Sequence, residues 1–183
     1  MSLIRDMDKN IIDLIIDQKI TDFYTELRSY LREKSVIVVK TEKLCDGAQL
    51  PQRAHESDFC FDVVATSCKH IGWRKWQYGI GLAFEMKKPE IFPNLQFDID
   101  FRPRSSVHKT GMILSNCIGT LDELYRGEVK AIFYRVTFGK RYKVGDRIGQ
   151  IAVNFTLPTR FEEVEKVDKN TERGTGGFGS TGR

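Results

Sequence analysis

Several features that mark secreted, membrane-bound or zinc-binding proteins are missing from this sequence. Its four cysteines (Cys45, Cys60, Cys68, Cys117) form no C-x-x-C pair and have no flanking histidine set. We therefore expect neither a disulfide framework nor a zinc site, but free thiols that are buried or half-buried. No apolar run approaches the length that crosses a bilayer, and no secretory signal is present. These absences lead us to expect a cytoplasmic protein with no membrane partner.

Runs of one charge are also missing. The chain of 183 residues carries 29 lysines and arginines against 25 acidic residues, and the resulting net charge of +4 is scattered along the sequence. This balance permits an anionic ligand but does not demand nucleic acid, and we expect no nucleic-acid partner. The length and the 40% of apolar residues suffice for one domain with a core plus an appendage.

Glycine and proline are absent from residues 3–34, where the pattern predicts helix. Apolar side chains recur there in steps of three and four: Ile4, Met7, Ile11 and Ile15, then Ile16, Ile20, Phe23, Leu27 and Tyr30. The phase shifts near residues 17–21, so one bent helix or two short helices would fit. We expect the apolar stripe to pack on its own domain, and a protein partner of these helices is the alternative.

From Ser35 onward the pattern of apolar and polar residues is typical of β-strands. Short apolar or alternating runs lie at residues 36–39, 60–65, 78–86, 97–101, 111–114, 129–138 and 147–155. Turn-prone clusters separate them, which predicts a mainly β fold, an antiparallel sandwich or a closed barrel. We expect a helical extension at residues 1–34, a β-barrel at 35–167 and a flexible arm at 168–183.

The last eleven residues, 173–183, contain five glycines and cannot hold a helix or a strand. They can bring backbone N–H groups close to an anionic ligand. Arg173, Ser180 and Thr181 suit phosphate oxygens, and Phe178 offers a flat face that can cover a base. The segment is not the phosphate loop of nucleotide hydrolases, because Ser180 stands where that loop requires lysine. A disordered tail is the alternative interpretation.

Residues 119–127 are the second strong signal. Glycines bracket Asp122 and Tyr125 between two strand-like runs, a pattern typical of a hairpin that exposes its backbone to a ligand. Asp122 can hold and deprotonate a water molecule, and Tyr125 can lie against a sugar ring. A plain turn with a solvated acid and a packed tyrosine is the alternative.

Two further segments suit phosphate. Arg104, Ser105 and Ser106 combine a guanidinium with adjacent hydroxyls, although a helix cap or turn would also use them. Residues 145–150 form a turn that leads into a strand, and Gln150 at its end can reach a phosphate or face solvent.

Taken together and in this order, these segments resemble the five motifs of the trimeric dUTP pyrophosphatases. The counterparts are Asp58–Ala65, Pro103–Ser106, Gly119–Gly127, Gly145–Gln150 and Arg173–Gly182. Phe59-Cys60 replaces a small Ala-Gly pair of the first motif, Leu124 stands where Asp or Gly is commoner, and Ser106 often corresponds to glycine. None of these departures removes a group on which the chemistry depends. The match begins near Val36, and the N-terminal 34 residues have no counterpart in the short members.

The resemblance implies a jelly-roll-like β-barrel that assembles as a homotrimer. Three active sites would lie at subunit interfaces, and the C-terminal arm would close over a neighbour's nucleotide. The implied reaction is the hydrolysis of dUTP to dUMP and pyrophosphate with Mg²⁺.

The resemblance also implies individual roles. Asp122 would activate the water that attacks the α-phosphorus. The phosphate chain would be held by Arg104, Ser105, Ser106 and Gln150, and then by Arg173, Ser180 and Thr181. The nucleoside would contact Asn116, the backbone at Gly119, Tyr125 and Phe178. Asp62 would meet Mg²⁺ through a bound water.

Two other functions remain open at this point. A dCTP deaminase of the same fold, or a bifunctional deaminase and dUTPase, shares the Arg-Ser-Ser motif. Tyr125 and the Phe178 arm favour dUTP hydrolysis, and the H-x-E and P-C-x-x-C signature of zinc deaminases is absent. A dUTP-sensing module that grips a protein through its N-terminal helices is the non-enzymatic alternative.

Overall fold

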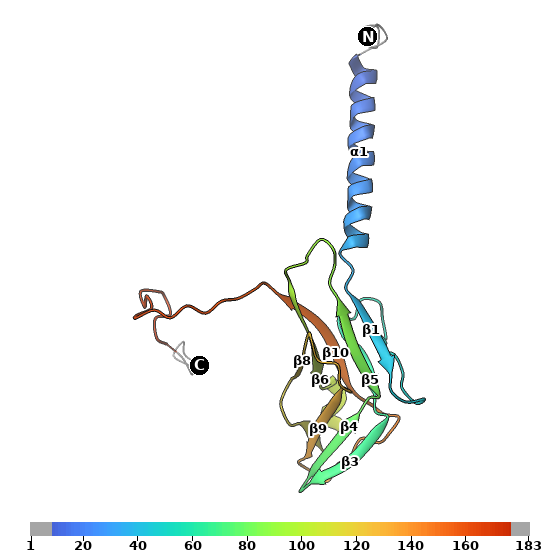
Figure 1. Cartoon of the computed structure of the whole chain (residues 1–183), viewed down its shortest axis with the longest axis vertical. Coiled ribbons are helices and arrows are strands. Elements are labelled where there is room, and N and C mark those ends of the chain that lie inside the picture. The colour runs from blue at the N-terminus through green and yellow to red at the C-terminus, as the bar shows by residue number, and fades with distance from the viewer. Residues whose placement is uncertain (1–8, 177–183) are drawn as a thin grey trace.

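The N-terminal segment forms one continuous helix, α1 (Lys9–Lys34), in the computed structural model, which describes residues 9–176 (Figure 1). The helix does not break where the apolar phase shifts. The hydroxyls of Thr21 and Thr25 donate to the carbonyls four residues earlier, both at 2.8 Å, and so stay inside the helix. No helix in the described range is long and apolar enough to cross a membrane.

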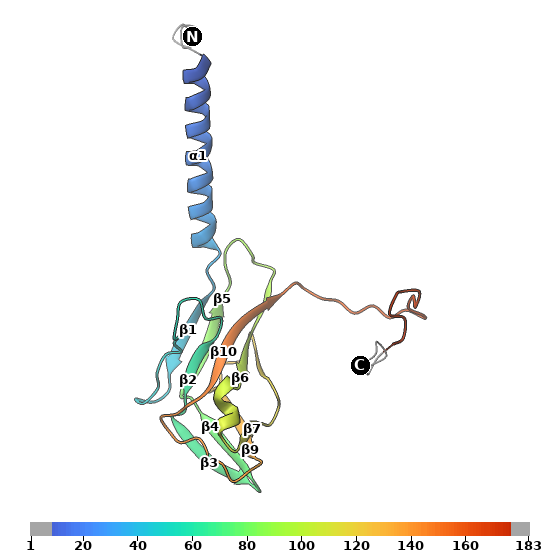
Figure 2. The same cartoon turned by 180° about the vertical axis from the view of Figure 1, so that it is seen from behind.

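Helix α1 stands away from the rest of the molecule (Figures 1 and 2). Its base is tied by one ion pair, in which Lys34 Nζ lies 3.1 Å from a Glu90 carboxylate oxygen. Its apolar side chains, such as Phe23 and Leu27, are exposed. The expectation that the stripe packs on its own domain is therefore wrong, because the helix projects beyond the sheets that would cover it.

Ten strands form three antiparallel sheets in the described part of the chain. They are β1 (Val38–Lys43), β2 (Phe61–Val64), β3 (Ser67–Gly72), β4 (Lys75–Gly79), β5 (Leu82–Lys87), β6 (Gln96–Arg102), β7 (Met112–Leu114), β8 (Gly119–Asp122), β9 (Lys130–Arg135) and β10 (Arg147–Thr156). The strand orders are β1-β5, β2-β10-β6-β8 and β3-β4-β9-β7. A short 3₁₀ helix, η1 (Ser105–Lys109), follows β6.

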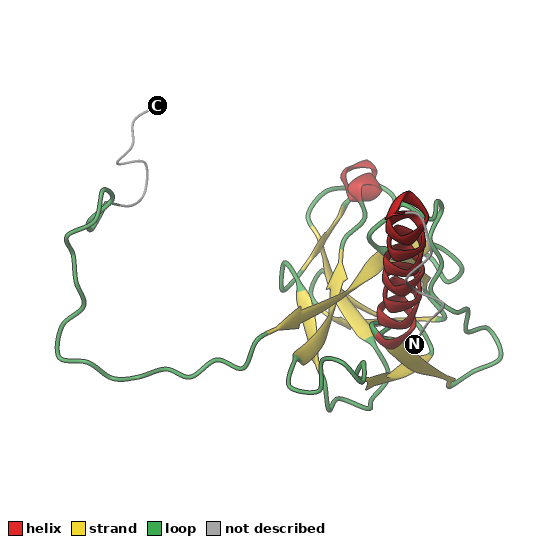
Figure 3. Cartoon of the chain, turned by 90° about the horizontal axis from the view of Figure 1, so that it is seen from above, coloured by secondary structure: helices red, strands yellow, loops and turns green. Residues whose placement is uncertain are grey.

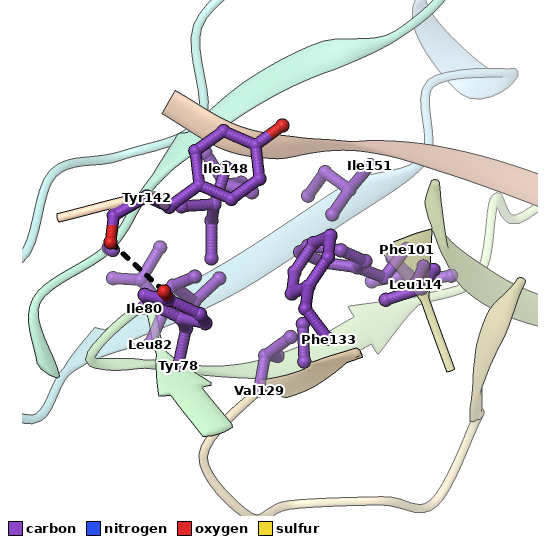
Figure 4. Close-up of a cluster of buried hydrophobic side chains, with 14 of the residues drawn as sticks. Tyr78, Ile80, Leu82, Phe101, Leu114, Val129, Phe133, Tyr142, Ile148 and Ile151 are labelled. Carbon is purple, nitrogen blue, oxygen red and sulfur yellow. Dashed lines mark hydrogen bonds between the residues drawn. The ribbon is translucent and has the colours of Figure 1, made fainter. Parts of the chain in front are cut away.

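The core lies between the sheets and collects side chains from most strands (Figure 4). Alternation in β6 buries Phe97, Ile99 and Phe101 on the core face and turns Asp98 and Arg102 to the other. The mainly β prediction is confirmed, although the sheets do not close into one continuous ring.

Three local expectations are corrected. Residues 78–86 form parts of two strands, because Gly81 adopts φ +66°, a left-handed conformation that glycine permits, and carries the chain into another sheet. Strand β3 escaped notice because its side chains from Ser67 to Ile71 are exposed and give no apolar alternation. Cys45, Cys68 and Cys117 are exposed, and only Cys60 is half-buried as expected.

After β10 the chain leaves the sheets as an extended segment (Figure 3). Residues 157–176 hold neither helix nor strand, in keeping with the polar and glycine-rich sequence there. Arg173 Nε donates to the carbonyl of Gly176 at 3.0 Å, so the one described arginine of the terminal motif contacts its own turn.

Candidate active site

Arg104 is held rigidly at the point where β6 passes into η1. Its Nε donates to Asp62 Oδ1 at 2.7 Å and its Nη2 to Asp62 Oδ2 at 3.1 Å, a two-pronged pair. Its Nη1 lies 3.3 Å from Ser106 Oγ. The structure thus groups Arg104 and Ser106 with Asp62, whereas Ser105 begins the 3₁₀ helix with an exposed side chain.

The sheet explains why Asp62 reaches a second arginine. Strand β10 runs between β2 and β6, with Gln150 level with Asp62 on one side and Arg102 on the other. A register irregularity between Arg147 and Gly149 shifts the start of β10. Arg147 Nη1 then donates to Asp62 Oδ2 at 2.9 Å.

A cavity of about 680 Å³ opens beside this arginine pair. Its lining includes the cations Arg104, Lys109, Lys140, Arg141, Lys143 and Arg147, together with Ser106 and a single carboxylate, Asp146. So many cations around one cavity attract a polyphosphate. Sequence reasoning missed most of them, although the three cations within residues 140–143 were a visible signal.

Tyr142 joins this cavity to the core. It lines the cavity, and its backbone carbonyl accepts from the hydroxyl of buried Tyr78 at 2.9 Å (Figure 4). Burial raises the pKa of the Tyr142 hydroxyl. The tyrosine is therefore neutral at physiological pH and leaves the positive field of the cavity intact.

A second, smaller cavity of about 210 Å³ lies along β8 and β9. Its polar lining contains Asn116, Gly119, Thr120, Asp122, Tyr125 and Lys130, and its apolar lining contains Phe101, Leu114, Leu121, Val129 and Ala131. The structure thus brings together Asn116, Gly119, Asp122 and Tyr125, four of the five residues that the sequence suggested for nucleoside and water. An apolar slot with a few polar groups at its edge suits a base and a sugar.

The hairpin between β8 and β9 fixes Asp122 and Tyr125. Asp122 ends β8 with an exposed side chain, and its carbonyl accepts from the Tyr125 amide at 2.9 Å. The Tyr125 hydroxyl donates to the carbonyl of Glu128 at 3.0 Å. A Cβ on Gly127 would lie 2.5 Å from that hydroxyl oxygen, so only glycine leaves space for this ring position.

Asp122 lies far from the Arg104 cluster within one chain. Asp62 and Asp122 occupy the outer strands of the order β2-β10-β6-β8, three strand spacings or about 14 Å apart. Along β6, Asp62 is level with Arg102 and Asp122 pairs with Asp98, an offset of about 13 Å. The separation is therefore about 20 Å, too long for Asp122 to serve a phosphate bound at Arg104 of its own chain.

Strand β6 carries a polar network between the two cavities. Asp100, 8% exposed, accepts from Arg102 Nη2 at 2.8 Å and from Thr120 Oγ1 at 2.9 Å. Burial raises the pKa of the Asp100 carboxyl, but these two hydrogen bonds outweigh burial and lower the pKa below its ordinary value. Asp100 is thus a charged structural residue that ties β6 to β8.

The chain offers no ready-made inner coordination sphere for a metal ion in the described range. Residues 9–176 contain no cluster of three His, Cys, Asp or Glu side chains. Asp62 already accepts three hydrogen bonds from Arg104 and Arg147. A carboxylate has about four lone-pair positions, which leaves Asp62 one for a water molecule. Only a contact through water fits this donor set.

Other sequence-predicted residues are less closely gathered. Gln150 is half-buried in β10 next to Asp62, but it does not line the basic cavity. Arg173 belongs to the segment after β10, which holds neither helix nor strand. Phe178, Ser180 and Thr181 lie outside the described residues.

Comparisons with known proteins agree on one family. The sequence model of the dUTPase family matches residues 100–182. The deoxyuridine 5'-triphosphate nucleotidohydrolase of Clostridium acetobutylicum is 36% identical over 151 residues, which cover 80% of this chain and 98% of that protein. The Fusobacterium nucleatum protein of the same name is 41% identical over 157 residues, covering 84% of this chain and 100% of that protein.

Solved structures show the same fold. A mutant dUTPase of Staphylococcus bacteriophage 80alpha, solved with dUpNHpp, superposes with a TM-score of 0.65 at 20% identity, covering 80% of this chain and 99% of that one. A mutant dUTPase of S. aureus phage phi11, described with a coordinated structural Mg(II) ion, gives 0.58 at 16% identity, covering 72% and 99%. The predicted jelly-roll-like architecture is thereby confirmed.

Proposed function

The chain belongs to the dUTPase family and is a dUTP diphosphatase, and we propose that its two cavities are halves of one active site that meet across subunits. The observation that carries this proposal is the separation of about 20 Å between Asp122 and the Arg104 cluster within one chain. Asp122 is the proposed base, so a second chain must bring its arginines to that carboxylate. A homotrimer with three shared sites satisfies this requirement.

The basic cavity is the proposed triphosphate site. Arg104, already oriented by Asp62, would bind phosphate oxygens without paying to order its side chain. Ser105 and Ser106 add hydroxyl donors beside it, and Gln150 adds an amide from β10. Arg147, which shares Asp62, is a further phosphate ligand in this proposal.

Asp122 is the proposed general base. Its carboxylate is exposed at the end of β8, on the rim of the nucleoside cavity, where it can hold a water molecule. The water would attack the α-phosphorus in line, and pyrophosphate would leave toward the cations of the basic cavity. Phosphoryl chemistry of this kind depends on positioning and charge neutralisation, which the two half-sites divide between them.

The smaller cavity is the proposed nucleoside site. The Asn116 amide and the backbone near Gly119 would pair with the uracil edge, and an unpaired donor there would reject cytosine. Tyr125, fixed by its bond to Glu128, would pack under the deoxyribose and leave no space for a 2′-hydroxyl. Phe178 would stack on the base when the arm closes, a contact worth about 1–3 kcal/mol.

Mg²⁺ is the proposed cofactor, and it fits only as an ion carried by the triphosphate with several waters. Bound there, it would neutralise phosphate charge. Asp62 would contact it through one water at most, because Arg104 and Arg147 occupy its other positions. The C-terminal arm would supply Arg173, Ser180 and Thr181 over the far phosphates.

The deciding experiment measures pyrophosphate release from dUTP, dTTP, dCTP and UTP with Mg²⁺. We expect rapid pyrophosphate release from dUTP and much slower release from dTTP, dCTP and UTP under the same conditions. An ammonia assay with dCTP tests the deaminase alternative, which the family comparison does not favour. Equal turnover of dTTP or UTP would contradict the nucleoside site proposed at Asn116 and Tyr125.

A further inference from the structure

Helix α1 carries an apolar seam that the hydrolysis of dUTP leaves unexplained. Its side chains are spaced by four, three, four and three residues: Ile16 (49% exposed), Ile20 (49%), Phe23 (60%), Leu27 (38%) and Tyr30 (54%). Alternate steps of four and three place side chains on one line with a period of 3.5 residues, the spacing of a coiled-coil seam. Tyr24 and Leu31 flank the seam and are also exposed.

Charged residues bound the seam at both ends. Asp13 lies seven residues before Ile20, and Lys34 lies seven residues after Leu27, where it pairs with Glu90. Between residues 16 and 30 the opposite side of the helix is polar, with Asp22 and Ser29 exposed there. The exposed apolar residues Ile11, Leu14 and Ile15 lie before the seam, near the start of the helix. The seam itself is a continuous surface of about four turns between residues 16 and 30.

The seam needs a cover. The described ion pair of α1 with the rest of the chain joins Lys34, the last residue of the helix, to Glu90 in the loop between β5 and β6, and the seam residues stand clear of the sheets. An isolated helix in water is marginally stable, since most helix stability comes from packing of an apolar face. We propose that the three α1 helices of one homotrimer pack through this seam as a parallel three-stranded coiled coil. This inference rests on the trimer of the proposed function.

The short link between α1 and β1 favours other copies of the same chain as the partners that cover the seam. Only residues 35–37 separate α1 from β1, and the Lys34–Glu90 ion pair fixes the base of the helix. Three barrels in a threefold assembly would therefore present three helices in the same direction, which makes the bundle parallel. Tethering of this kind raises the effective concentration of each helix to about the millimolar range.

The aromatic side chains supply much of the area that such a bundle buries. Phe23, Tyr24 and Tyr30 bury roughly 150 Å² each when covered, about 450 Å² per helix and about 1,350 Å² over the three helix pairs. Each helix pair gains about 450 Å² from them, less than the roughly 1,000 Å² of a stand-alone interface, so the bundle depends on tethering to the barrels as well. The relatives from Clostridium and Fusobacterium are matched almost whole by about four-fifths of this chain. The bundle would be an addition to the barrel, since none of the residues proposed for dUTP hydrolysis lies on α1.

Oxidative cross-linking of single-cysteine additions tests the proposal. The Leu27→Cys variant places a thiol in the seam, and the Ser29→Cys variant, about 200° around the helix, is its matched control with the same native cysteines. We expect a covalent dimer on denaturing gels for Leu27→Cys only, with a yield that does not fall on dilution. Equal yields for both variants, or none for either, would overturn the proposal.

Hydrogen exchange on the full chain provides a second measurement. Amides of residues 16–31 should exchange slowly in the unmodified protein and at least tenfold faster in the Ile20→Asp, Leu27→Asp double variant. Both proteins should sediment as trimers and hydrolyse dUTP. Fast exchange in the unmodified trimer, protection only in the presence of another protein, or a hexamer mass would overturn the coiled coil while leaving dUTP hydrolysis intact. A monomeric unmodified chain would instead remove the shared-site proposal on which the inference rests.

Discussion

At Asp62 one carboxylate serves two guanidinium groups, and this explains how a positive cavity can be rigid before substrate arrives. Arg104 and Arg147 would repel each other if nothing lay between them. Asp62, with a side-chain exposure of 16%, accepts from both; water screens its pair with Arg104 (25% exposed) less than its pair with Arg147 (55% exposed). The first role we propose for Asp62 is therefore to position the arginines.

Asp122 provides the sharpest prediction at this scale. The Asp122→Asn variant should lower kcat by about 10²–10⁴-fold, the usual loss when a general base is removed. Its fold should persist, because the side chain is exposed at the end of β8. Steady-state pyrophosphate release measures the loss, and thermal unfolding checks the fold.

The neighbouring carboxylate is the matched control for Asp122. Glu123 bonds the Phe97 amide at 3.3 Å and pairs with Lys88 at 3.1 Å, away from the nucleoside cavity. Glu123→Gln removes the same charge and should leave kcat within a few-fold of the unmodified enzyme. Similar losses in both variants would show that general electrostatics, and not base catalysis, explains the effect.

Asp100 should contribute stability that depends on pH. Its folded-state pKa lies below the ordinary value of 3.8, so the contribution is complete above about pH 4 and is lost as the pH falls through the folded-state pKa. Asp100→Asn should lower the free energy of unfolding at pH 7 by about 1–3 kcal/mol. Urea unfolding between pH 7 and pH 3 should show the difference shrinking below about pH 4. A difference that stays constant to pH 3 would contradict the assignment.

The residues of the site were predictable to different degrees. Asn116, Gly119, Asp122 and Tyr125 are close in sequence, so a hairpin with bracketing glycines was enough to group them. Asp62 and Arg147 are 85 residues apart and meet because β2 pairs with β10, with a register irregularity next to Arg147. No local sequence pattern predicts such a pairing. Lys140, Arg141 and Lys143 were visible as charges, but not as the wall of a cavity.

At the scale of elements, the β8–β9 hairpin shows how glycine sets a site. Gly127 leaves the space that Tyr125 fills, and the tyrosine hydroxyl then reaches the carbonyl of Glu128 at 3.0 Å. The ring is thereby fixed relative to Asp122, whose carbonyl begins the turn. The hairpin thus holds the proposed base, Asp122, and the aromatic ring of Tyr125 as one unit.

Gly127→Ala should therefore impair catalysis without removing a reactive group. The added Cβ would lie 2.5 Å from the Tyr125 hydroxyl oxygen and 2.7 Å from its ring carbon Cζ, so the ring must move. We expect kcat/KM for dUTP to fall by about 10- to 100-fold, the scale of a displacement near 1 Å. Gly47→Ala, with no atom within 4 Å of the new Cβ, is the control and should keep full activity. An unchanged kcat/KM in Gly127→Ala would show that the position of the Tyr125 ring does not matter for substrate binding.

Strands were predictable wherever one face is buried. In β6 the alternation of apolar and polar residues follows from a core on one side, whereas β10 was visible as a short apolar run at residues 151–153. Strand β3 gives no such signal, because pairing with β4 and not burial holds it in place. The sequence correctly predicted that α1 is a helix, but not that its apolar stripe is exposed. An apolar stripe alone does not show whether it packs on its own chain or on another one.

In the whole molecule, each chain holds the proposed phosphate ligands far from the proposed base, although the proposed reaction needs both at one substrate. Each chain holds the Arg104 cluster at one end of the sheet β2-β10-β6-β8 and Asp122 about 20 Å away. A closed ring of three chains can pair each base with a neighbour's arginines and leave no half-site unused. The long arm after β10 and the projecting helix α1 both leave the barrel, as expected of segments that contact other subunits.

Mixed trimers test this division directly. Asp122→Asn and Arg104→Gln chains should each be nearly inactive alone, because every site lacks either its base or its phosphate ligand. In trimers assembled from equal amounts of both, half of the Asp122 contributions and half of the Arg104 contributions are intact. About a quarter of all sites should then combine an intact base with an intact arginine. If each site were instead built within one chain, every chain would carry a lesion in its own site. Mixing would then restore nothing, and the recovered rate of pyrophosphate release distinguishes the two arrangements.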